Sequence, residues 1–276
     1  MNPERLPPSE SEPEEAAPPP VSPTAEPSSG ETAPAPPAAP PPERYPFWGY
    51  ADVLLFAGLA IPSMFLGWAF VQGILHLFHF HFALRAAELL AEQLAGYVIL
   101  FSALRLMFRV EYDRPFWRSL GWTRLGAPFL WLVIAGFATA VGVALATYIV
   151  HVPSTTNPMM ELLADRGSIL LLATFGVTLG PLCEELAFRG FLQPLLVRSL
   201  GATGGVLAAA VPFGLLHIPE YGNSWRHGLV IALAGAAFGC VRQVTGSTKA
   251  STVMHASYNF LFFFVLISQG RDLPHT

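Results

Sequence analysis

The sequence predicts an all-α polytopic integral membrane protein, with about seven (six to eight) membrane-spanning helices and a disordered N-terminal tail. Of its 276 residues, 53% are hydrophobic and only 12% are charged, and its mean hydropathy is +0.47. Because a soluble globular domain carries about 25% charged residues, this balance indicates that lipid surrounds most of the chain.

The first 46 residues differ in composition from the rest. They hold 16 of the 26 prolines and eight glutamates against two arginines, with almost no large apolar side chains. Such a segment buries too little surface to offset the entropy that ordering costs. We therefore expect a disordered, solvated tail, and it lacks the basic start and apolar run of a cleavable signal peptide.

The apolar windows follow the tail in close succession. A membrane span needs about 20 mostly apolar residues, and the windows that qualify are 50–76, 86–108, 127–151, 168–199, 203–219, 227–245 and 250–268. Between two of them, the segment 111–122 mixes charges with tryptophan and phenylalanine, as an interfacial segment at headgroup level does. We divide the chain into the tail (1–46), N-terminal transmembrane helices (47–160) and a C-terminal transmembrane region (161–270).

The positive charges predict the orientation. Arginine and lysine gather in alternate connections, chiefly 105–124, 189–198 and 242–249. Positive residues favour the cytoplasmic side, so we expect the tail inside and the C-terminus outside. The excess of 14 arginines over one lysine, with abundant alanine and proline, is typical of a GC-rich bacterium. We accordingly expect the bacterial inner membrane.

The stretch PLCEELAFRG (181–190) places three charges in an apolar window. Ionisable residues at membrane depth are functional candidates, because burying each is costly unless it is paired or hydrated. Glu185 and Arg189 stand four residues apart with the acid first, which favours an ion pair. Glu184 points about 100° away and has no partner in its own helix, which suits a general base. Pro181 predicts a helix break that would place the glutamates near a helix N-terminus.

Two later windows each carry a histidine with a partner four residues away. Phe213 and His217 share one helix face, and His255 and Asn259 share another. Taken alone, each histidine is also typical of a hydrogen bond between membrane helices. The donors of His255 and Asn259 can, however, point at a single oxygen, as an oxyanion hole requires.

The three clusters together supply the parts of a hydrolytic site. A glutamate base, a histidine and a donor pair are what activation of water and stabilisation of a tetrahedral intermediate need. The pattern therefore predicts an enzyme, a hydrolase that cleaves an acyl compound within the membrane.

The order E-E-x-x-x-R, F-x-x-x-H and H-x-x-x-N on successive hydrophobic segments resembles the CPBP family of membrane proteases. That family, also called Abi, includes the eukaryotic CAAX prenyl endopeptidases and bacterial proteins linked to bacteriocin maturation or self-immunity. The resemblance covers about residues 165–268 and implies an intramembrane endopeptidase for membrane-associated or CAAX-like peptides. It implies that Glu184 activates water with help from His217, and that His255 and Asn259 bind the oxyanion. Glu185 and Arg189, with Phe213, would hold the site in shape.

The sequence leaves the cofactor open between none and a divalent metal such as zinc. Glu184, His217 and His255 supply two nitrogens and a carboxylate, a set that zinc accepts, but the compact H-E-x-x-H spacing is absent. A metal-free mechanism with a water polarised by glutamate and histidine fits the same residues, and we favour it.

Two other functions compete with the protease. One is a non-catalytic immunity or interaction protein of the same fold, against which the complete motif set argues. The other is a transporter that uses Glu184 and the histidines as a proton or metal relay, but no inverted repeat is visible in the sequence. We expect membrane lipid and a peptide or membrane-protein substrate as partners, and no nucleic acid. Span counting places Glu184 in the cytoplasmic half.

Other polar residues have structural readings. Glu88 and Glu92 are like charges four residues apart, which repel unless one is protonated or paired. We interpret them as an interfacial helix end, with a functional cavity or proton relay as the alternative. His76, His79 and His81 alternate with aromatics, as in an interfacial belt.

The two cysteines follow no metal or redox spacing. Cys183 and Cys240 both lie in apolar windows, and we predict that they are small buried packing residues.

Overall fold

The computed structural model describes residues 44–153 and 166–269, and within these ranges the regular structure is entirely helical. The elements are, in order, α1 (Tyr50–Leu77), α2 (Arg85–Val110), α3 (Phe116–Ser119), α4 (Phe129–Ile149), α6 (Arg166–Val177), α7 (Leu179–Glu185), the π-helix η1 (Leu186–Leu192), α8 (Gln193–Leu216), the 3-10 helix η2 (Pro219–Tyr221), α9 (Trp225–Thr245) and α10 (Thr248–Gln269). The predicted all-α class is confirmed.

Six helical runs in the described residues are long and apolar enough to cross a membrane. The longest, Arg166–Leu216, combines α6, α7, η1 and α8 and bends at Gly201, whose φ of 75° and ψ of 172° are non-helical. Glycine adopts such a positive φ without a steric cost. The predicted windows 168–199 and 203–219 lie on either side of this bend, so about seven apolar segments agree with the prediction.

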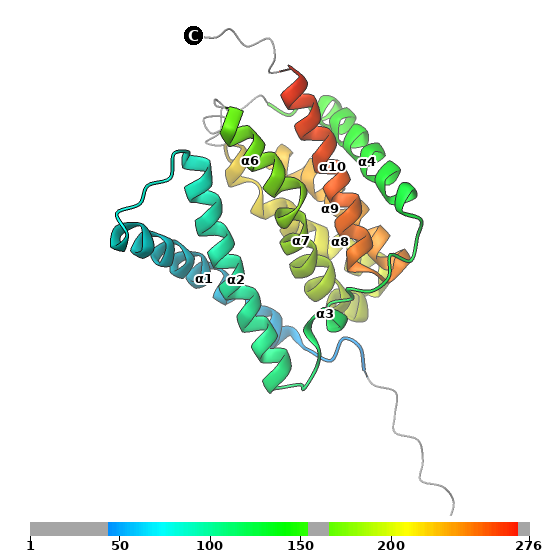
Figure 1. The fold of residues 1–276 in the computed structure, drawn as a ribbon. Helices are drawn as coiled ribbons and strands as arrows, with labels where there is room; N and C mark the ends of the chain where they lie inside the picture. Colours follow the sequence, from blue (N-terminus) through cyan, green and yellow to red (C-terminus); the bar gives the residue numbers. More distant parts are fainter. Residues whose placement is uncertain (1–43, 154–165, 270–276) are drawn as a thin grey trace, which may run out of the picture. The chain divides into compact units, whose positions relative to one another are not determined.

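Helices α1 and α2 form an antiparallel pair at one side of the described fold (Figure 1). The Gln72 amide of α1 donates to Glu88 Oε1 and to Glu92 Oε1 of α2, each at 2.7 Å. One neutral donor therefore bridges the two like charges, which explains how they coexist four residues apart.

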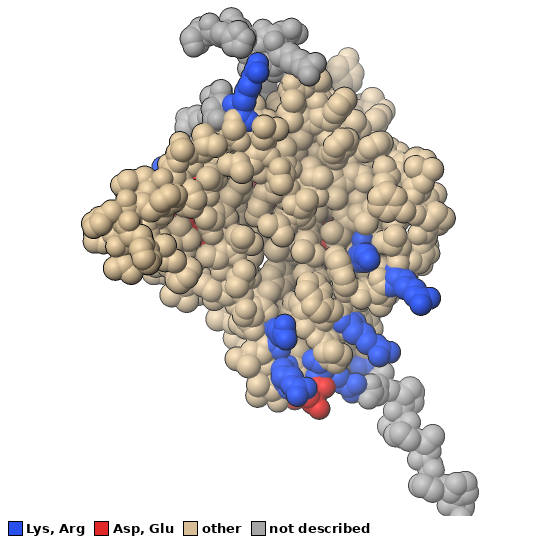
Figure 2. Space-filling view, viewed as in Figure 1, with Lys and Arg blue, Asp and Glu red and all other residues tan. Residues whose placement is uncertain are grey.

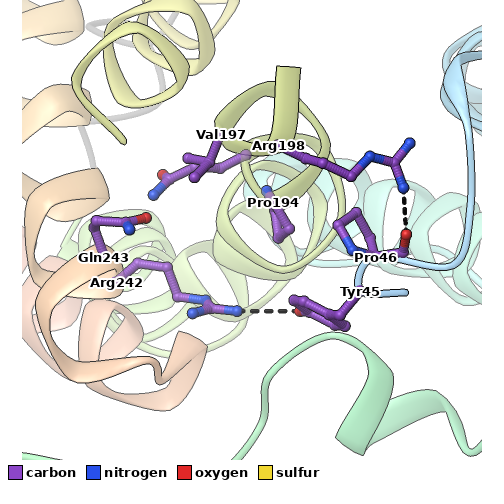
Figure 3. A pocket seen from close by; sticks show the side chains of 8 residues that line it. Tyr45, Pro46, Pro194, Val197, Arg198, Arg242 and Gln243 are labelled. Atoms are coloured by element: carbon purple, nitrogen blue, oxygen red, sulfur yellow. Dashed lines mark hydrogen bonds between the residues drawn. The ribbon is translucent and has the colours of Figure 1, made fainter. Parts of the chain in front are cut away.

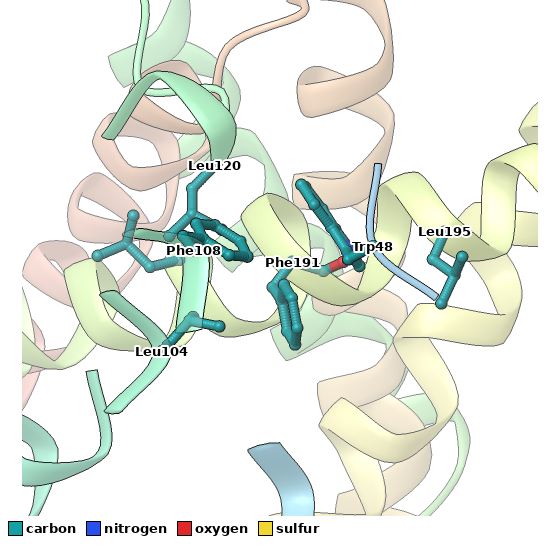
Figure 4. Packing of buried hydrophobic residues seen from close by; sticks show 7 residues of the cluster. Trp48, Leu104, Phe108, Leu120, Phe191 and Leu195 are labelled. Carbon is teal, nitrogen blue, oxygen red and sulfur yellow. The ribbon is translucent and has the colours of Figure 1, made fainter. Parts of the chain in front are cut away.

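A buried aromatic cluster joins the N-terminal helices to η1 and α8 (Figure 4). Trp48 is fully buried, stacks on Phe108 and on Phe191 with ring centroids 5.3 Å apart in each case, and donates Nε1–H to the Phe191 carbonyl at 3.0 Å. Helices in lipid associate through such packing and hydrogen bonds, because lipid chains are as apolar as leucine. The cluster therefore fixes the start of α1 and the end of α2 against η1.

In the C-terminal region α8 packs along α9, and α4 packs along α10 (Figure 1). A side chain at Gly214 of α8 would collide with the Gly228 carbonyl of α9. Glycine at this position allows a close approach of the two helices, as small residues do in membrane proteins. The approach lies three residues before His217, so it also sets the position of that histidine.

Positive charges concentrate at the end of the molecule where α2 terminates and α3 lies (Figure 2). This concentration of positive charge at one end agrees with the sequence, in which arginine and lysine gather in alternate connections. The side of the membrane to which this end belongs remains a prediction.

Candidate active site

The predicted helix break lies at Thr178, between α6 and α7. Its φ of −121° and ψ of −82° interrupt the helix three residues before Pro181. Glu184 and Glu185 stand at the far end of the seven-residue α7, which runs directly into η1. Because the dipole effect fades within the first turn, the expectation that a helix N-terminus holds the two glutamates is wrong.

The predicted pair of Glu185 and Arg189 is present. Glu185 Oε1 lies 3.0 Å from Arg189 Nη1, with side chains 0% and 1% exposed. Arg189 Nη2 donates to the Gly235 carbonyl at 2.7 Å, and Arg189 Cζ lies 4.3 Å from the ring centre of Phe213. A buried ion pair persists only with good geometry and additional hydrogen bonds, and here α9 provides them.

His255 stands between the two adjacent glutamates and faces each with a different nitrogen. Its Nδ1 lies 3.1 Å from Glu185 Oε1, and its Nε2 lies 3.8 Å from Glu184 Oε2. The second distance is too long for a direct hydrogen bond, and the Glu184 side chain is 27% exposed. The ring is held flat against Phe238, with centroids 4.4 Å apart. Glu184 is thus the accessible carboxylate of the pair.

His217 caps the C-terminal end of α8 and is half-buried. Its Nδ1 lies 2.7 Å from the Phe213 carbonyl oxygen. A carbonyl only accepts, so Nδ1 carries the proton and Nε2 of the neutral ring is an acceptor. The Phe213 ring lies 4.8 Å from the ring of His217 and 5.9 Å from that of His255. Both predicted histidines therefore flank one phenylalanine.

Asn259 has a partner that the sequence did not indicate. Its Nδ2 donates to the Gly176 carbonyl at the end of α6, at 2.6 Å. One amide hydrogen is therefore held by α6, and the amide keeps a second N–H. A joint role of Asn259 and His255 toward one oxygen remains a prediction.

Glu220 of η2 belongs to the same cluster and was missed. It is close enough to interact electrostatically with both His217 and Glu184. Although the residue is exposed at the end of the bundle, crowding buries its carboxyl enough to raise its pKa; His217 opposes this rise and Glu184 adds to it. Its position three residues after His217 was the sequence feature that could have identified Glu220 as part of the site.

An apolar pocket of about 250 Å³ lies beside the site, between α2 and the α7–η1 segment. Its walls include Tyr97, Phe101, Leu182, Cys183 and Leu186. Cys183 directly precedes Glu184, and Tyr97 is close enough to interact electrostatically with that glutamate.

The cysteines differ in environment. Cys183 is half-buried in the pocket wall, whereas Cys240 is exposed on α9. The prediction that Cys240 is a buried packing residue is therefore wrong. On a membrane helix, an apolar side chain packs equally well against lipid.

The structure does not group Glu184, His217 and His255, the proposed zinc set, as three metal ligands. Among the described residues, no three His, Cys, Asp or Glu side chains are grouped as metal ligands. Of the proposed zinc set, Glu184 and His255 approach each other. His217 donates Nδ1–H to a backbone carbonyl and keeps Nε2 open, an arrangement that metal-ligating histidines share. We derive no step through a metal.

Residues 166–261 match the family described as type II CAAX prenyl endopeptidase Rce1-like. The match covers about a third of the chain and contains every site residue from Glu184 to Asn259. It confirms the resemblance to the CPBP proteases for this segment. The comparisons with curated proteins and with solved structures gave no match.

Proposed function

We propose that this chain, with its Rce1-like segment, is an intramembrane endopeptidase that uses Glu184 to activate water. The observation that supports this most is the asymmetry of the adjacent glutamates. Glu185 is fully buried and neutralised by Arg189, whereas Glu184 is accessible and lies 3.8 Å from His255 Nε2. A general base needs a carboxylate that can reach the proton it removes, and Glu184 is the member of the pair that satisfies this.

In the proposed reaction Glu184 takes a proton from water while the water oxygen attacks the carbonyl carbon of the peptide bond. His217 accepts a hydrogen bond from the same water at Nε2 and orients it. The tetrahedral intermediate then expels the amine, and Glu184 returns its proton to the leaving nitrogen. Each proton is accounted for, and Glu184 ends as a carboxylate.

His255 and Asn259 are the proposed donors to the oxyanion. Donation from His255 Nε2, while Nδ1 stays on Glu185, requires the imidazolium form of the ring. Because Arg189 already balances Glu185, the compensating negative charge comes from Glu184, whose Oε2 lies 3.8 Å from His255 Nε2. Donors held in place before the reaction stabilise the developing oxyanion without reorganisation.

The proposed substrate is a membrane-associated peptide with an apolar or lipid-modified residue near the scissile bond. The apolar pocket between α2 and the α7–η1 segment supports this, because its wall includes Cys183, the residue directly before Glu184. The protein would act from within the bacterial inner membrane, with its site in the cytoplasmic half.

The test is peptide cleavage by purified full-length protein in liposomes, against a library of membrane peptides. Wild type, Glu184→Ala and His217→Ala are compared, each with and without a chelator. We expect cleavage by the wild type, loss in both variants, and no effect of the chelator. Correct folding is checked by the thermal unfolding midpoint of each variant.

The remaining outcomes decide among the other functions. Cleavage that the chelator abolishes and added zinc restores would replace the metal-free mechanism. A wild type that cleaves nothing in the library, or folded variants that cleave normally, would favour the non-catalytic interaction protein.

A further inference from the structure

A second pocket lies where the chain enters α1, and none of its lining residues belongs to the candidate active site. Its volume is about 290 Å³. Figure 3 shows two arginines, Arg198 from α8 and Arg242 from α9, that reach toward the Tyr45–Pro46 segment. The remaining walls are Gln193, Pro194, Val197 and Gln243.

Arg242 is a buried cation with only neutral partners. It is 9% exposed, donates Nε–H to Thr248 Oγ1 at 3.0 Å, and donates from Nη2 to Tyr45 Oη at 3.3 Å. Although Tyr45 is half exposed, desolvation by its neighbours raises its pKa, and the nearby Arg242 only partly offsets this. The phenol is therefore neutral at physiological pH and does not balance the guanidinium charge. In the described part of the chain, no carboxylate pairs with Arg242.

Arg198 brings a second cation to the same cavity. It is half-buried, and its Nη1 donates to the Pro46 carbonyl. Across the described ranges, it too lacks an acidic partner. Burying charge without compensation is costly, so two such arginines around one cavity indicate an anionic ligand. The planar guanidinium suits phosphate in particular, since it offers paired donors.

The pocket lies beside the start of α1 and the last turn of α9, at the ends of two candidate membrane spans. It is formed by the C-terminal part of α9, the stretch of α8 before the Gly201 bend and the segment before α1. Tyr45, which is half exposed, is of the residue type that marks the membrane interface. Basic pockets between membrane helices at the cytoplasmic side bind acidic lipid headgroups.

We infer that this pocket binds a phosphate group, presented by the headgroup of an acidic phospholipid. The phosphate lies in the cavity that both arginines line, where both cations attract it. It supplies the negative charge that the neutral oxygens of Pro46, Tyr45 and Thr248 do not. A bound headgroup links the chain before α1 to α8 and α9. It therefore stabilises the folded protein and is independent of the peptidase chemistry.

The experiment measures the thermal unfolding midpoint of full-length protein in neutral detergent micelles. The micelles contain phosphatidylglycerol or phosphatidylcholine, and a third arm adds inorganic phosphate alone. Variants are Arg198→Gln, at a half-buried position, and Gln243→Glu, which places a carboxylate at an exposed position of the wall. Lys249→Gln is the matched control, because it removes one positive charge at an exposed position outside the pocket.

We expect phosphatidylglycerol to raise the wild-type midpoint more than phosphatidylcholine does, and Lys249→Gln to keep this difference. Both pocket variants should lose it while unfolding normally without lipid. A rise with inorganic phosphate alone that the pocket variants abolish would keep the site and make free phosphate its ligand. A rise that is equal in pocket variants and control, or absent in the wild type, would overturn the inference.

Discussion

Glu184 and Glu185 are neighbours in the chain, but they occupy opposite environments. The helix turn of about 100° per residue sends Glu185 toward Arg189 and His255 of α10, and Glu184 toward the more open side. That separation was predictable, because an i, i+4 pair and the helical period are local properties. Their common neighbour His255 lies 70 residues further along the chain, and no local pattern specifies such a contact. The same holds for the contact of Asn259 with Gly176, whereas Glu220 was close enough to His217 to have been included.

We predict that Glu185→Gln destabilises the protein far more than Glu184→Gln does. Removing one partner of a buried ion pair leaves Arg189 uncompensated, which costs about 3–5 kcal/mol. The measurement is the midpoint of thermal unfolding in detergent, with Glu184→Gln as the matched control one residue away. Equal midpoints for the two variants would show that the Glu185–Arg189 pair does not hold this region together.

At the scale of elements, the site depends on interruptions of regular helix. Thr178 breaks α6 from α7, η1 widens the turn that carries Arg189, and Gly201 bends the run into two apolar segments. The predicted windows 168–199 and 203–219 separate at Gly201, although the helix break was predicted near Pro181 and none was predicted here. The π-helix was not predictable, because its side-chain pattern resembles that of an α-helix and its geometry depends on neighbours. Such π segments occur frequently at functional sites.

We predict that Gly214→Ala impairs both stability and cleavage. The added methyl would meet the Gly228 carbonyl, so α8 must move from α9, and overpacking of this kind costs about 1–3 kcal/mol. Because His217 lies on the next turn, the displacement reaches the site. Unfolding midpoints and cleavage rates measure the two effects.

Gly73→Ala in α1 is the control, since a methyl group there has open space around it. It should leave cleavage unchanged and stabilise α1 slightly, by roughly 0.5–1 kcal/mol. If Gly214→Ala behaved like Gly73→Ala, the close approach of α8 and α9 would not matter.

At the scale of the whole molecule, the charge distribution and the aromatic cluster of Trp48 determine the arrangement. Composition and window length were sufficient to predict the class and about seven segments, because lipid imposes a strict length and polarity on each span. How α1 and α2 attach to the rest was not predictable. The attachment relies on Trp48, Phe108 and Phe191, which are distant from one another in sequence. Each of them alone is an ordinary apolar residue in the sequence, so none indicates the contact.

The positive-inside pattern predicts that the end rich in arginine and lysine is cytoplasmic. In a variant with both cysteines replaced by alanine, Arg85→Cys and Lys249→Cys introduce exposed thiols at connections of opposite predicted sides. A membrane-impermeant maleimide added to right-side-out vesicles should label Arg85→Cys and spare Lys249→Cys until the vesicles are opened. The reverse labelling would invert the topology and place the tail outside.

The central claim is that Glu184 is the base that activates water. The most direct test measures the single-turnover rate at which purified Glu184→Gln protein cleaves one peptide that the wild type cleaves. The amide keeps the shape of the side chain but cannot take a proton from water. The account predicts a rate at least about 100-fold lower than wild type, with an unchanged unfolding midpoint. A folded Glu184→Gln protein that cleaves at the wild-type rate would contradict the assignment of Glu184 as the base.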